Sequence, residues 1–212
     1  MKEYKTIYAD PPYPQKIIGK FAERNRRALE LPYNTMSIEE ICNLPINELA
    51  DKECHLWIWT TNQFLHDTFH IIEKWGFKYL QTITWIKPSG CGAYFVNTTQ
   101  HLLFAYKEKC IFKRGRFKPT HFKTSIPKGH SVKPTQVYTM IEDISEEPRL
   151  ELFARNRREG WDVFGNEIPK DTQRLITKMG GNFTPNGVVE LGLNGSATAP
   201  PKDFSSTEKS FV

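Results

Sequence analysis

The sequence predicts an α/β fold, a mostly parallel and doubly wound sheet with helices on both faces. Short apolar runs rich in β-branched and aromatic residues alternate with segments of helical periodicity between residues 4 and 155. This alternation is typical of parallel sheets whose strands are joined by helices. The 212 residues, of which 39% are hydrophobic, are enough to bury one large core, so we expect a single folded domain.

The first predicted strand, residues 4–9, ends at Asp10, Pro11, Pro12 and Tyr13. Neither proline can donate a hydrogen bond to a neighbouring strand, so the strand must stop at Asp10. Ligands of open α/β sheets bind at the carboxyl ends of strands, which places Asp10 at the mouth of a cleft. Its carboxylate and the proline carbonyls could accept both hydrogens of a flat amino group, while Tyr13 stacks on the base that carries it. The four residues alone also fit an ordinary turn.

Capping and periodicity predict the elements that follow. Residues 37–40 have the S-x-x-E form of a capping box and open a helix, which Pro45 breaks or restarts. Residues 55–60 are predicted to form a second buried strand, and Asn62 can cap a helix that Gly76 ends. Two further strands, a helix and a last strand are predicted over residues 77–87, 101–106, 135–144 and 149–155.

Two segments rich in lysine and arginine are candidates for contact with phosphates. The first, residues 15–32, directly follows the acidic-proline turn and could close over whatever that turn holds. The second, residues 107–133, carries nine lysines and arginines, one acid and interleaved phenylalanines. Either segment could equally be a solvated basic loop. The candidate nucleic-acid contacts are Lys16, Lys20, Arg24, Arg26, Arg27, Lys113, Arg114 and Arg116.

Polar residues next to predicted helix and strand ends are candidates for ligand binding. His130, Ser131 and Lys133 precede a helix whose first turn holds a proline. The positive end of that helix would attract a phosphate or a carboxylate. Asn166 and Glu167 could bind ribose hydroxyls, although each of these residue types alone is more often found on the surface.

The composition also limits the classes of protein, the kinds of cysteine site and the extent of the folded domain. No apolar run approaches the roughly 20 residues of a membrane span, and the N-terminus does not resemble a signal peptide. The four cysteines lie far apart without a CxxC pair, which favours free thiols in a reducing cytoplasm over disulfides or a zinc site. Residues 170–212 are rich in Gly, Asn, Thr, Ser and Pro, so we expect a disordered tail after a domain of residues 1–169.

The chain contains eight short motifs in a fixed order, which are residues 10–13 (DPPY), 33–36 (YNTM), 56–62 (LWIWTTN), 75–77 (WGF), 85–87 (WIK), 130–134 (HSVKP), 151–155 (ELFAR) and 160–167 (GWDVFGNE). Together they resemble the METTL-type family of adenine methyltransferases. That family includes the catalytic subunit of the eukaryotic messenger-RNA adenosine methyltransferase and compact bacterial and phage DNA adenine methyltransferases. The resemblance covers residues 4–168.

The resemblance implies a seven-stranded, Rossmann-like domain that uses S-adenosylmethionine, with a permuted motif order in which the acidic-proline motif precedes the cofactor segments. It implies that Asp10, Pro11, Pro12 and Tyr13 hold the target amine and are the catalytic residues. It also implies that Lys133 pairs with the methionine carboxylate of the cofactor. The remaining cofactor contacts are expected at His130, Ser131, Glu151, Phe153, Arg155, Asn166 and Glu167.

Two positions depart from the pattern of the family. Tyr13 stands where many relatives have tryptophan, and Gln100 stands where many carry an acid. The compact chain favours DNA as the substrate, with RNA as the alternative, and a base in duplex DNA must be flipped out to react. The family also contains non-catalytic nucleic-acid-binding subunits, but these typically lose the acidic-proline motif that is intact here. The recognition sequence and the choice between monomer and homodimer stay open.

Overall fold

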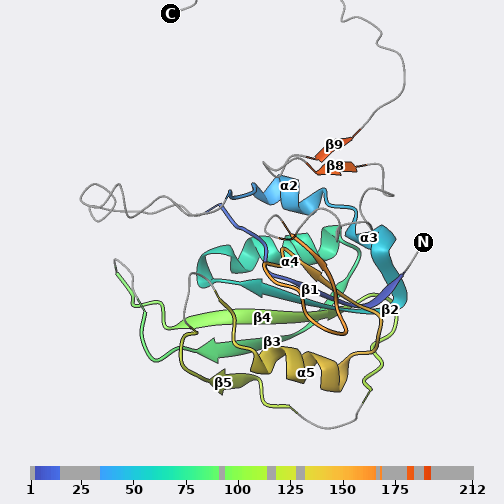
Figure 1. Ribbon diagram of the computed structural model, residues 1–212. Helices are drawn as coiled ribbons and strands as arrows, with labels where there is room; N and C mark the ends of the chain where they lie inside the picture. The colour runs from blue at the N-terminus through green and yellow to red at the C-terminus, as the bar shows by residue number, and fades with distance from the viewer. Residues whose placement is uncertain are drawn as a thin grey trace, which may run out of the picture.

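The computed structural model describes residues 3–14, 34–90, 94–113, 118–127, 132–165, 168, 181–183 and 189–191. Its main sheet contains seven strands, the number that the family resemblance implied, in the order β5-β3-β4-β2-β1-β6-β7 (Figure 1). The strands are β1 (Tyr4–Ala9), β2 (Ala50–Thr60), β3 (Lys78–Ile86), β4 (Thr99–Tyr106), β5 (His121–Lys123), β6 (Arg149–Leu152) and β7 (Asp162–Phe164). The described helices are α2 (Ile38–Cys42), α3 (Ile46–Leu49), η2 (Asn62–Phe64, a 3₁₀ turn), α4 (Leu65–Lys74) and α5 (Gln136–Ile144).

The sheet is mostly parallel, which confirms the prediction. β1 pairs in parallel with β2 and β6, β3 with β5, and β6 with β7. β4 is the exception, because it runs antiparallel to both β2 and β3. Six strands therefore end at one edge of the sheet, which we call the carboxyl edge, and β4 begins there. In consequence, the connection between β3 and β4 also lies at the carboxyl edge, on the left of Figure 1.

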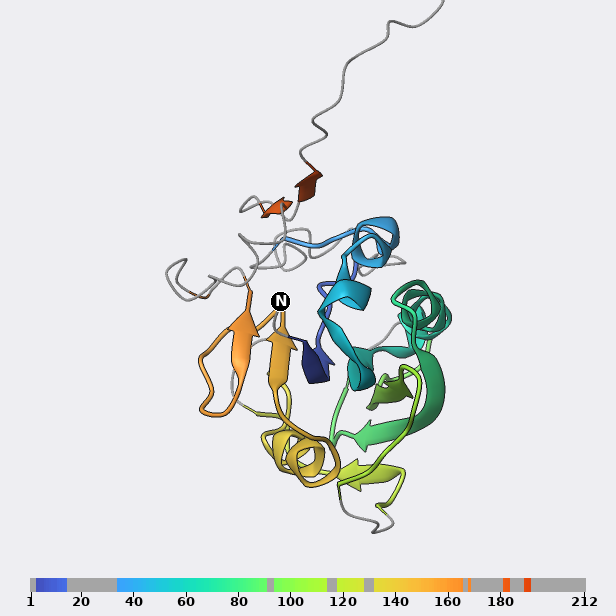
Figure 2. The same ribbon diagram turned by 90° about the vertical axis from the view of Figure 1, so that its right-hand side faces the viewer.

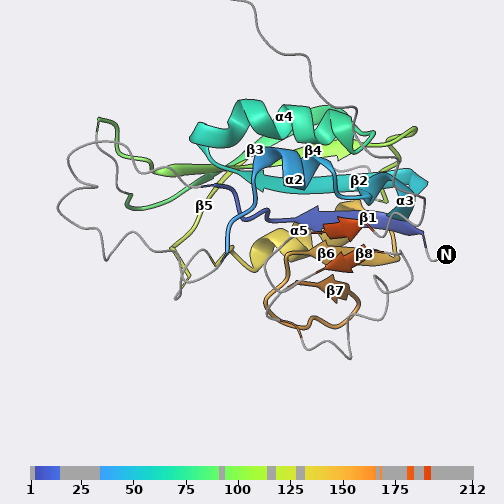
Figure 3. The ribbon, with the colours of Figure 1, turned by 90° about the horizontal axis from the view of Figure 1, so that it is seen from above.

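Helices cover both faces of the sheet, as predicted. Figure 2, a view along the strands, shows α5 on one side and α2 to α4 on the other, and Figure 3 shows β1 between β2 and β6. Successive residues of a strand point to opposite faces, so β1 and β2 contribute to two cores. The α4 side buries aliphatic residues such as Leu56 and Ile71. The α5 side buries the aromatic rings of Tyr8, Trp57 and Trp59.

The helix termini confirm two predictions and correct a third. The capping box is formed, because Ser37 Oγ accepts from the Glu40 backbone and Glu40 Oε2 accepts from the Ser37 backbone. Gly76, at a φ of 80°, follows the end of α4. The prediction that Asn62 caps a helix is wrong. α4 begins only at Leu65, and the Asn62 amide instead contacts Thr99 Oγ1 (3.1 Å) and His101 Nε2 (2.7 Å).

The end of the chain follows the predictions less closely. The strand expected over residues 149–155 stops at Leu152, because Phe153 has a φ of 61° and cannot continue an extended strand. In the segment predicted to be disordered, the structure describes a two-stranded antiparallel pair, β8 (Gly181–Phe183) and β9 (Val189–Leu191). The boundary between domain and tail stays a prediction. Within the described residues, no helix has both the length and the apolar character that crossing a bilayer would require.

Candidate active site

The acidic-proline turn lies where the sequence predicted, directly beyond β1 at the carboxyl edge. The Asp10 side chain is 31% exposed there. The Pro11 carbonyl accepts the Tyr13 N–H at 2.9 Å, and the Pro12 carbonyl accepts the Met36 N–H at 2.8 Å. The first bond closes the turn, and the second attaches it to the residues before α2. Each carbonyl oxygen keeps a second lone pair that can accept a further hydrogen.

Tyr13 lies in a different environment from the one expected for it. Its side chain is buried, its ring stacks on Phe64 at 5.0 Å, and its hydroxyl donates to the Trp59 carbonyl at 3.0 Å and contacts Thr68 Oγ1. A ring held in this way is not placed to stack on a target base. In this conformation Tyr13 instead anchors the acidic-proline turn to β2 and α4.

Lys133 and Asp10, which are 123 residues apart in the sequence, form an ion pair. Lys133 Nζ lies 2.5 Å from Asp10 Oδ2 and 5.4 Å from the centre of the Trp59 ring. The Lys133 side chain is only 11% exposed. The loop before α5 therefore places an ammonium group next to the carboxylate of the acidic-proline turn. The sequence predicted different partners for the two residues, the cofactor for Lys133 and the substrate amine for Asp10.

A second carboxylate, Glu151 of β6, lies on the same face of the sheet. Glu151 is opposite Tyr8 in the register of β1 and β6, and Asp10 follows Tyr8 by two residues on the α5 side. Tyr138 of α5 donates a hydrogen bond to Glu151 Oε1 at 2.8 Å. The guanidinium carbon of Arg158 lies 4.0 Å from the centre of the Tyr138 ring. Asp10, Glu151 and the Lys133 ammonium group thus lie near the carboxyl edge, while Arg158 lies along α5, where its Nε is 3.4 Å from Glu142 Oε1.

The pKa of Glu151 is raised to about 7, chiefly by burial and to a smaller extent by the nearby charge of Asp10. The hydrogen bond from Tyr138 and the charge of Arg158 act in the opposite direction. Because the pKa in the folded state is above its ordinary value near 4.5, the folded state binds this proton more tightly than the unfolded state does. The stabilisation from this proton is fully present below pH 4.5 and is lost as the pH rises through about 7.

Glu151→Gln is therefore expected to remove a pH dependence of stability. Glutamine keeps an acceptor for Tyr138 but does not titrate. Between about pH 5 and pH 8, the free energy of unfolding of the wild type should fall relative to that of the variant, by up to about 3 kcal/mol. Urea denaturation of both proteins at both pH values measures this difference. The exposed Glu159→Gln is the control, and equal pH slopes for Glu151→Gln and the wild type would refute the assignment.

Two segments predicted to bind the cofactor approach each other closely. Phe153 lies in the left-handed region directly after β6, and such strained residues are concentrated at functional sites. The Ala154 N–H donates to the Phe164 carbonyl at 2.9 Å. A Cβ atom on Gly165 would lie 2.0 Å from the Ala154 carbonyl oxygen, so only glycine fits there. The chain that leads to Asn166 therefore runs against the chain that leads to Arg155, which is half-buried.

The structure leaves several predicted residues untested. His130, Ser131, Asn166 and Glu167 lie outside the described residues, as do the candidate nucleic-acid contacts Lys16, Lys20, Arg24, Arg26, Arg27, Arg114 and Arg116. Lys113 is described and is exposed, but its N–H donates to the carbonyl of Ile144 at the far end of α5. This places it at the opposite end of the helix from Lys133, about 13 Å along the axis, and away from the carboxyl edge.

Sequence reasoning did not select Tyr138 and Arg158. Tyr138 is one helical turn beyond the proline that opens α5, on the helix face that meets the sheet, and this spacing is a signal that could have identified it. Arg158 lies in the loop between β6 and β7, and its position over the Tyr138 ring has no sequence signal that we recognise.

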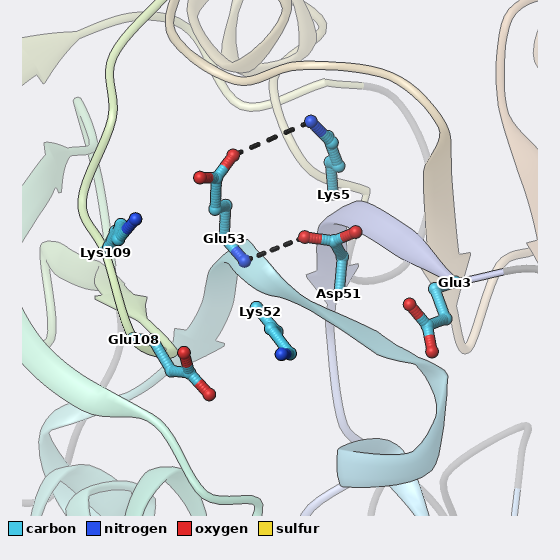
Figure 4. A pocket seen from close by; sticks show the side chains of 7 residues that line it. All are labelled: Glu3, Lys5, Asp51, Lys52, Glu53, Glu108 and Lys109. Carbon is cyan, nitrogen blue, oxygen red and sulfur yellow. Dashed lines mark hydrogen bonds and ion pairs between the residues drawn. The ribbon is translucent and has the colours of Figure 1, made fainter.

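A charged pocket of about 330 Å³ lies at the opposite edge of the sheet, near the amino ends of β1 and β2 (Figure 4). Its lining mixes lysine with aspartate and glutamate, and Lys5 lies 3.7 Å from Glu53 across it. Exposed pairs of this kind contribute little to stability, and the mixed charge favours no phosphate. This pocket contains none of the predicted site residues.

The side chains at the carboxyl edge fit a zwitterion. The Lys133 ammonium group can pair with a carboxylate, and the carboxylates of Asp10 and Glu151 can accept hydrogens from an ammonium group. The amino-acid portion of a cofactor such as S-adenosylmethionine carries these two charges. The donor set is therefore compatible with the cofactor that the sequence resemblance implies.

Comparison with known proteins gives a consistent set of matches. The family model described as MT-A70 matches residues 4–167. The chain is 29% identical to the type II methyltransferase M.MunI of Mycoplasma sp, over 84% of this chain and 83% of that protein. It is 28% identical to an Arabidopsis thaliana N(6)-adenosine-methyltransferase MT-A70-like protein, over 78% of this chain but 24% of that protein. It is also 28% identical to the human N(6)-adenine-specific methyltransferase METTL4, over 80% of this chain and 38% of that protein.

Proposed function

The chain belongs to the MT-A70 family of adenine methyltransferases that use S-adenosylmethionine, and on this premise we propose that it methylates the exocyclic amine of adenine in DNA. The observation that supports the proposal best is the meeting of Asp10 and Lys133 at the carboxyl edge. DNA is preferred over RNA because the chain spans 83% of a type II methyltransferase but only about a quarter of the plant adenosine methyltransferase. We also propose a cytoplasmic location and the permuted motif order.

Lys133 and Glu151 would hold the amino-acid end of the cofactor, and Phe153 and Arg155 would lie along its nucleoside. Bound there, S-adenosylmethionine supplies a methyl group on a sulfonium, which is a good leaving group. If Lys133 paired with a carboxylate of the cofactor, it would give up its contact with Asp10. Cofactor binding would in this way free the Asp10 carboxylate to accept a hydrogen bond from the substrate.

The acidic-proline turn would orient the target amine. Asp10 and the second lone pair of the Pro11 carbonyl can accept its two hydrogens and favour a pyramidal nitrogen whose lone pair is free to react. Positioning of this kind can supply much of the lowering of a barrier. The amine of neutral adenine is a very weak acid, so Asp10 would take the proton only after transfer, when the nitrogen is cationic. The role of Tyr13 in this scheme is to hold the turn rigid.

Transfer of tritiated methyl groups to unmethylated genomic DNA and to RNA, measured side by side, tests the proposed substrate. We expect label in DNA that is recovered as methylated adenine. Label in RNA alone would mean that the substrate is RNA and not DNA. Label in neither, together with no binding of S-adenosylmethionine in a calorimetric titration, would support the alternative of a non-catalytic nucleic-acid-binding subunit.

Lys133→Ala is expected to weaken the binding of S-adenosylmethionine by roughly 10- to 100-fold, because a charge-assisted hydrogen bond contributes about 1.5–3 kcal/mol. The Kd from calorimetry measures the effect. Lys118→Ala is a matched control, since Lys118 pairs with Asp143 at 2.9 Å on the surface of α5. A Kd for Lys133→Ala near that of the wild type would refute the assigned role.

A further inference from the structure

The loop between β3 and β4 carries exposed aromatic rings at the carboxyl edge. Tyr94 is 88% exposed, Phe95 is 84% exposed and Val96 is 63% exposed. Tyr94 and Phe95 are the most exposed of the large apolar side chains described. Neither ring is part of the two buried cores. Exposed apolar surface of this kind commonly marks an interaction site, and these three residues follow one another in the sequence.

The arms of this loop are held together beyond the ends of the two strands. The Lys87 N–H donates to the Thr98 carbonyl at 2.7 Å, and the Thr98 N–H donates to the Val96 carbonyl at 2.9 Å. Further out, a Cβ atom on Gly90 would lie 2.3 Å from the Asn97 carbonyl oxygen, so the two arms are in direct contact there. The two described arms of the hairpin, residues 87–90 and 94–98, therefore extend together beyond the ends of β3 and β4, on the left of Figure 1.

The surroundings of the loop are basic. Residues 87–127 contain one acidic residue, Glu108, whose N–H donates to the Lys52 carbonyl near the start of β2, at the far edge of the sheet. At the carboxyl edge the neighbouring positions are Lys87, at the end of β3, and the exposed Lys123, at the end of β5. Rings that protrude among cations suit a polyanion whose subunits have flat apolar faces, which is the chemistry of a nucleic acid.

We propose that Tyr94 and Phe95 stack on bases of the DNA substrate next to the target adenine and hold the duplex opened for the reaction. This inference rests on the proposed function. β3 is separated from β1 by β4 and β2, so three strand spacings, about 14 Å, lie between the base of the loop and Asp10. That distance is about four stacked base pairs. While Asp10 holds the flipped adenine, the rings reach the part of the helix from which the adenine has been withdrawn.

The test is a double variant, Tyr94→Ala with Phe95→Ala, in the full chain. Loss of two base–aromatic stacks, each contributing about 1–3 kcal/mol, predicts a rise of roughly 30-fold or more in the KM for unmethylated genomic DNA, with the Kd for S-adenosylmethionine unchanged. Exchange of the rings, Tyr94→Phe with Phe95→Tyr, keeps both stacking surfaces and should restore the KM. Leu80→Ala is the control, because Leu80 is 45% exposed near the opposite end of β3.

Three results separate this inference from the proposed function. A wild type that methylates DNA and a double variant with the same KM would overturn the inference alone. A double variant that changes only the oligomeric state in sedimentation, with DNA binding intact, would also overturn it, because the loop would then join two copies of the chain. A wild type that methylates no DNA would remove the proposed function and the inference with it.

Discussion

An Asp10→Ala variant is expected to lose methyl transfer by roughly 10³-fold or more while keeping most of its affinity for S-adenosylmethionine. Asp10 is the carboxylate that the acidic-proline turn places at the end of β1, where it would orient the amine for transfer. Misplacement of a reacting group by about 1 Å can by itself cost about 10²-fold, and the complete loss of the acceptor costs more. Cofactor affinity should be maintained because Lys133, without its partner Asp10, is available for a carboxylate.

Single-turnover transfer of tritiated methyl groups to DNA measures the rate, and calorimetry measures the cofactor Kd. Asp143→Asn is the control, because it breaks another ion pair, with Lys118, away from the carboxyl edge. Asp10→Asn adds a stricter test, since it preserves the shape of the side chain but removes its charge. If either Asp10 variant transfers methyl groups at a rate within about tenfold of the wild type, Asp10 does not have the proposed role.

Ser145→Ala is expected to lower the free energy of unfolding by about 2–6 kcal/mol. The Ser145 hydroxyl is fully buried, accepts a hydrogen bond from Trp57 Nε1 at 3.0 Å and contacts His55 Nδ1 at 2.8 Å. Burial lowers the pKa of His55 to about 4, so its ring is neutral near pH 7 and can accept the hydroxyl proton. Removal of the hydroxyl leaves two buried polar groups without this partner, and each costs about 1–3 kcal/mol.

Urea denaturation of the variant measures the loss, with the exposed Ser89→Ala as a control expected within about 0.5 kcal/mol of the wild type. Because Ser145 is at the end of α5, far from Lys133 at its start, the cofactor Kd of the folded variant should be unchanged. A change in unfolding free energy as small as that of Ser89→Ala would mean that Trp57 and His55 find other partners.

The strands and helices were largely predictable because the spacing of apolar residues, and the prolines and capping residues at segment ends, determine local structure. Two prolines end β1 at Ala9, and a serine and a glutamate three residues apart open α2. The direction of β4 was not predictable, since an apolar run reads the same for a parallel and an antiparallel neighbour. The expected cap at Asn62 failed because Thr99 and His101, 37 and 39 residues away, bind the amide instead.

The candidate site was predictable where chain geometry alone decides a position. Asp10 could be placed because a strand that ends in prolines stops at a known edge. The burial of Tyr13 was not predictable, since an aromatic residue after a strand can turn to a ligand or to the core with equal ease. The contacts of Asp10 with Lys133 and of Glu151 with Tyr138 join separate segments, and they depend on how α5 packs on the sheet.

The reversed direction of β4 has a consequence for how this protein can diverge. A connection between antiparallel neighbours is a hairpin, whereas the parallel neighbours β1, β2 and β6 need a crossover that the sheet must accommodate. Doubling the length of a flexible loop costs only about 0.6 kcal/mol in closure entropy. Insertions between β3 and β4 can therefore accumulate with little loss of stability. New preferences for DNA sequence can arise there while the acidic-proline turn, residues 10–13, stays unchanged.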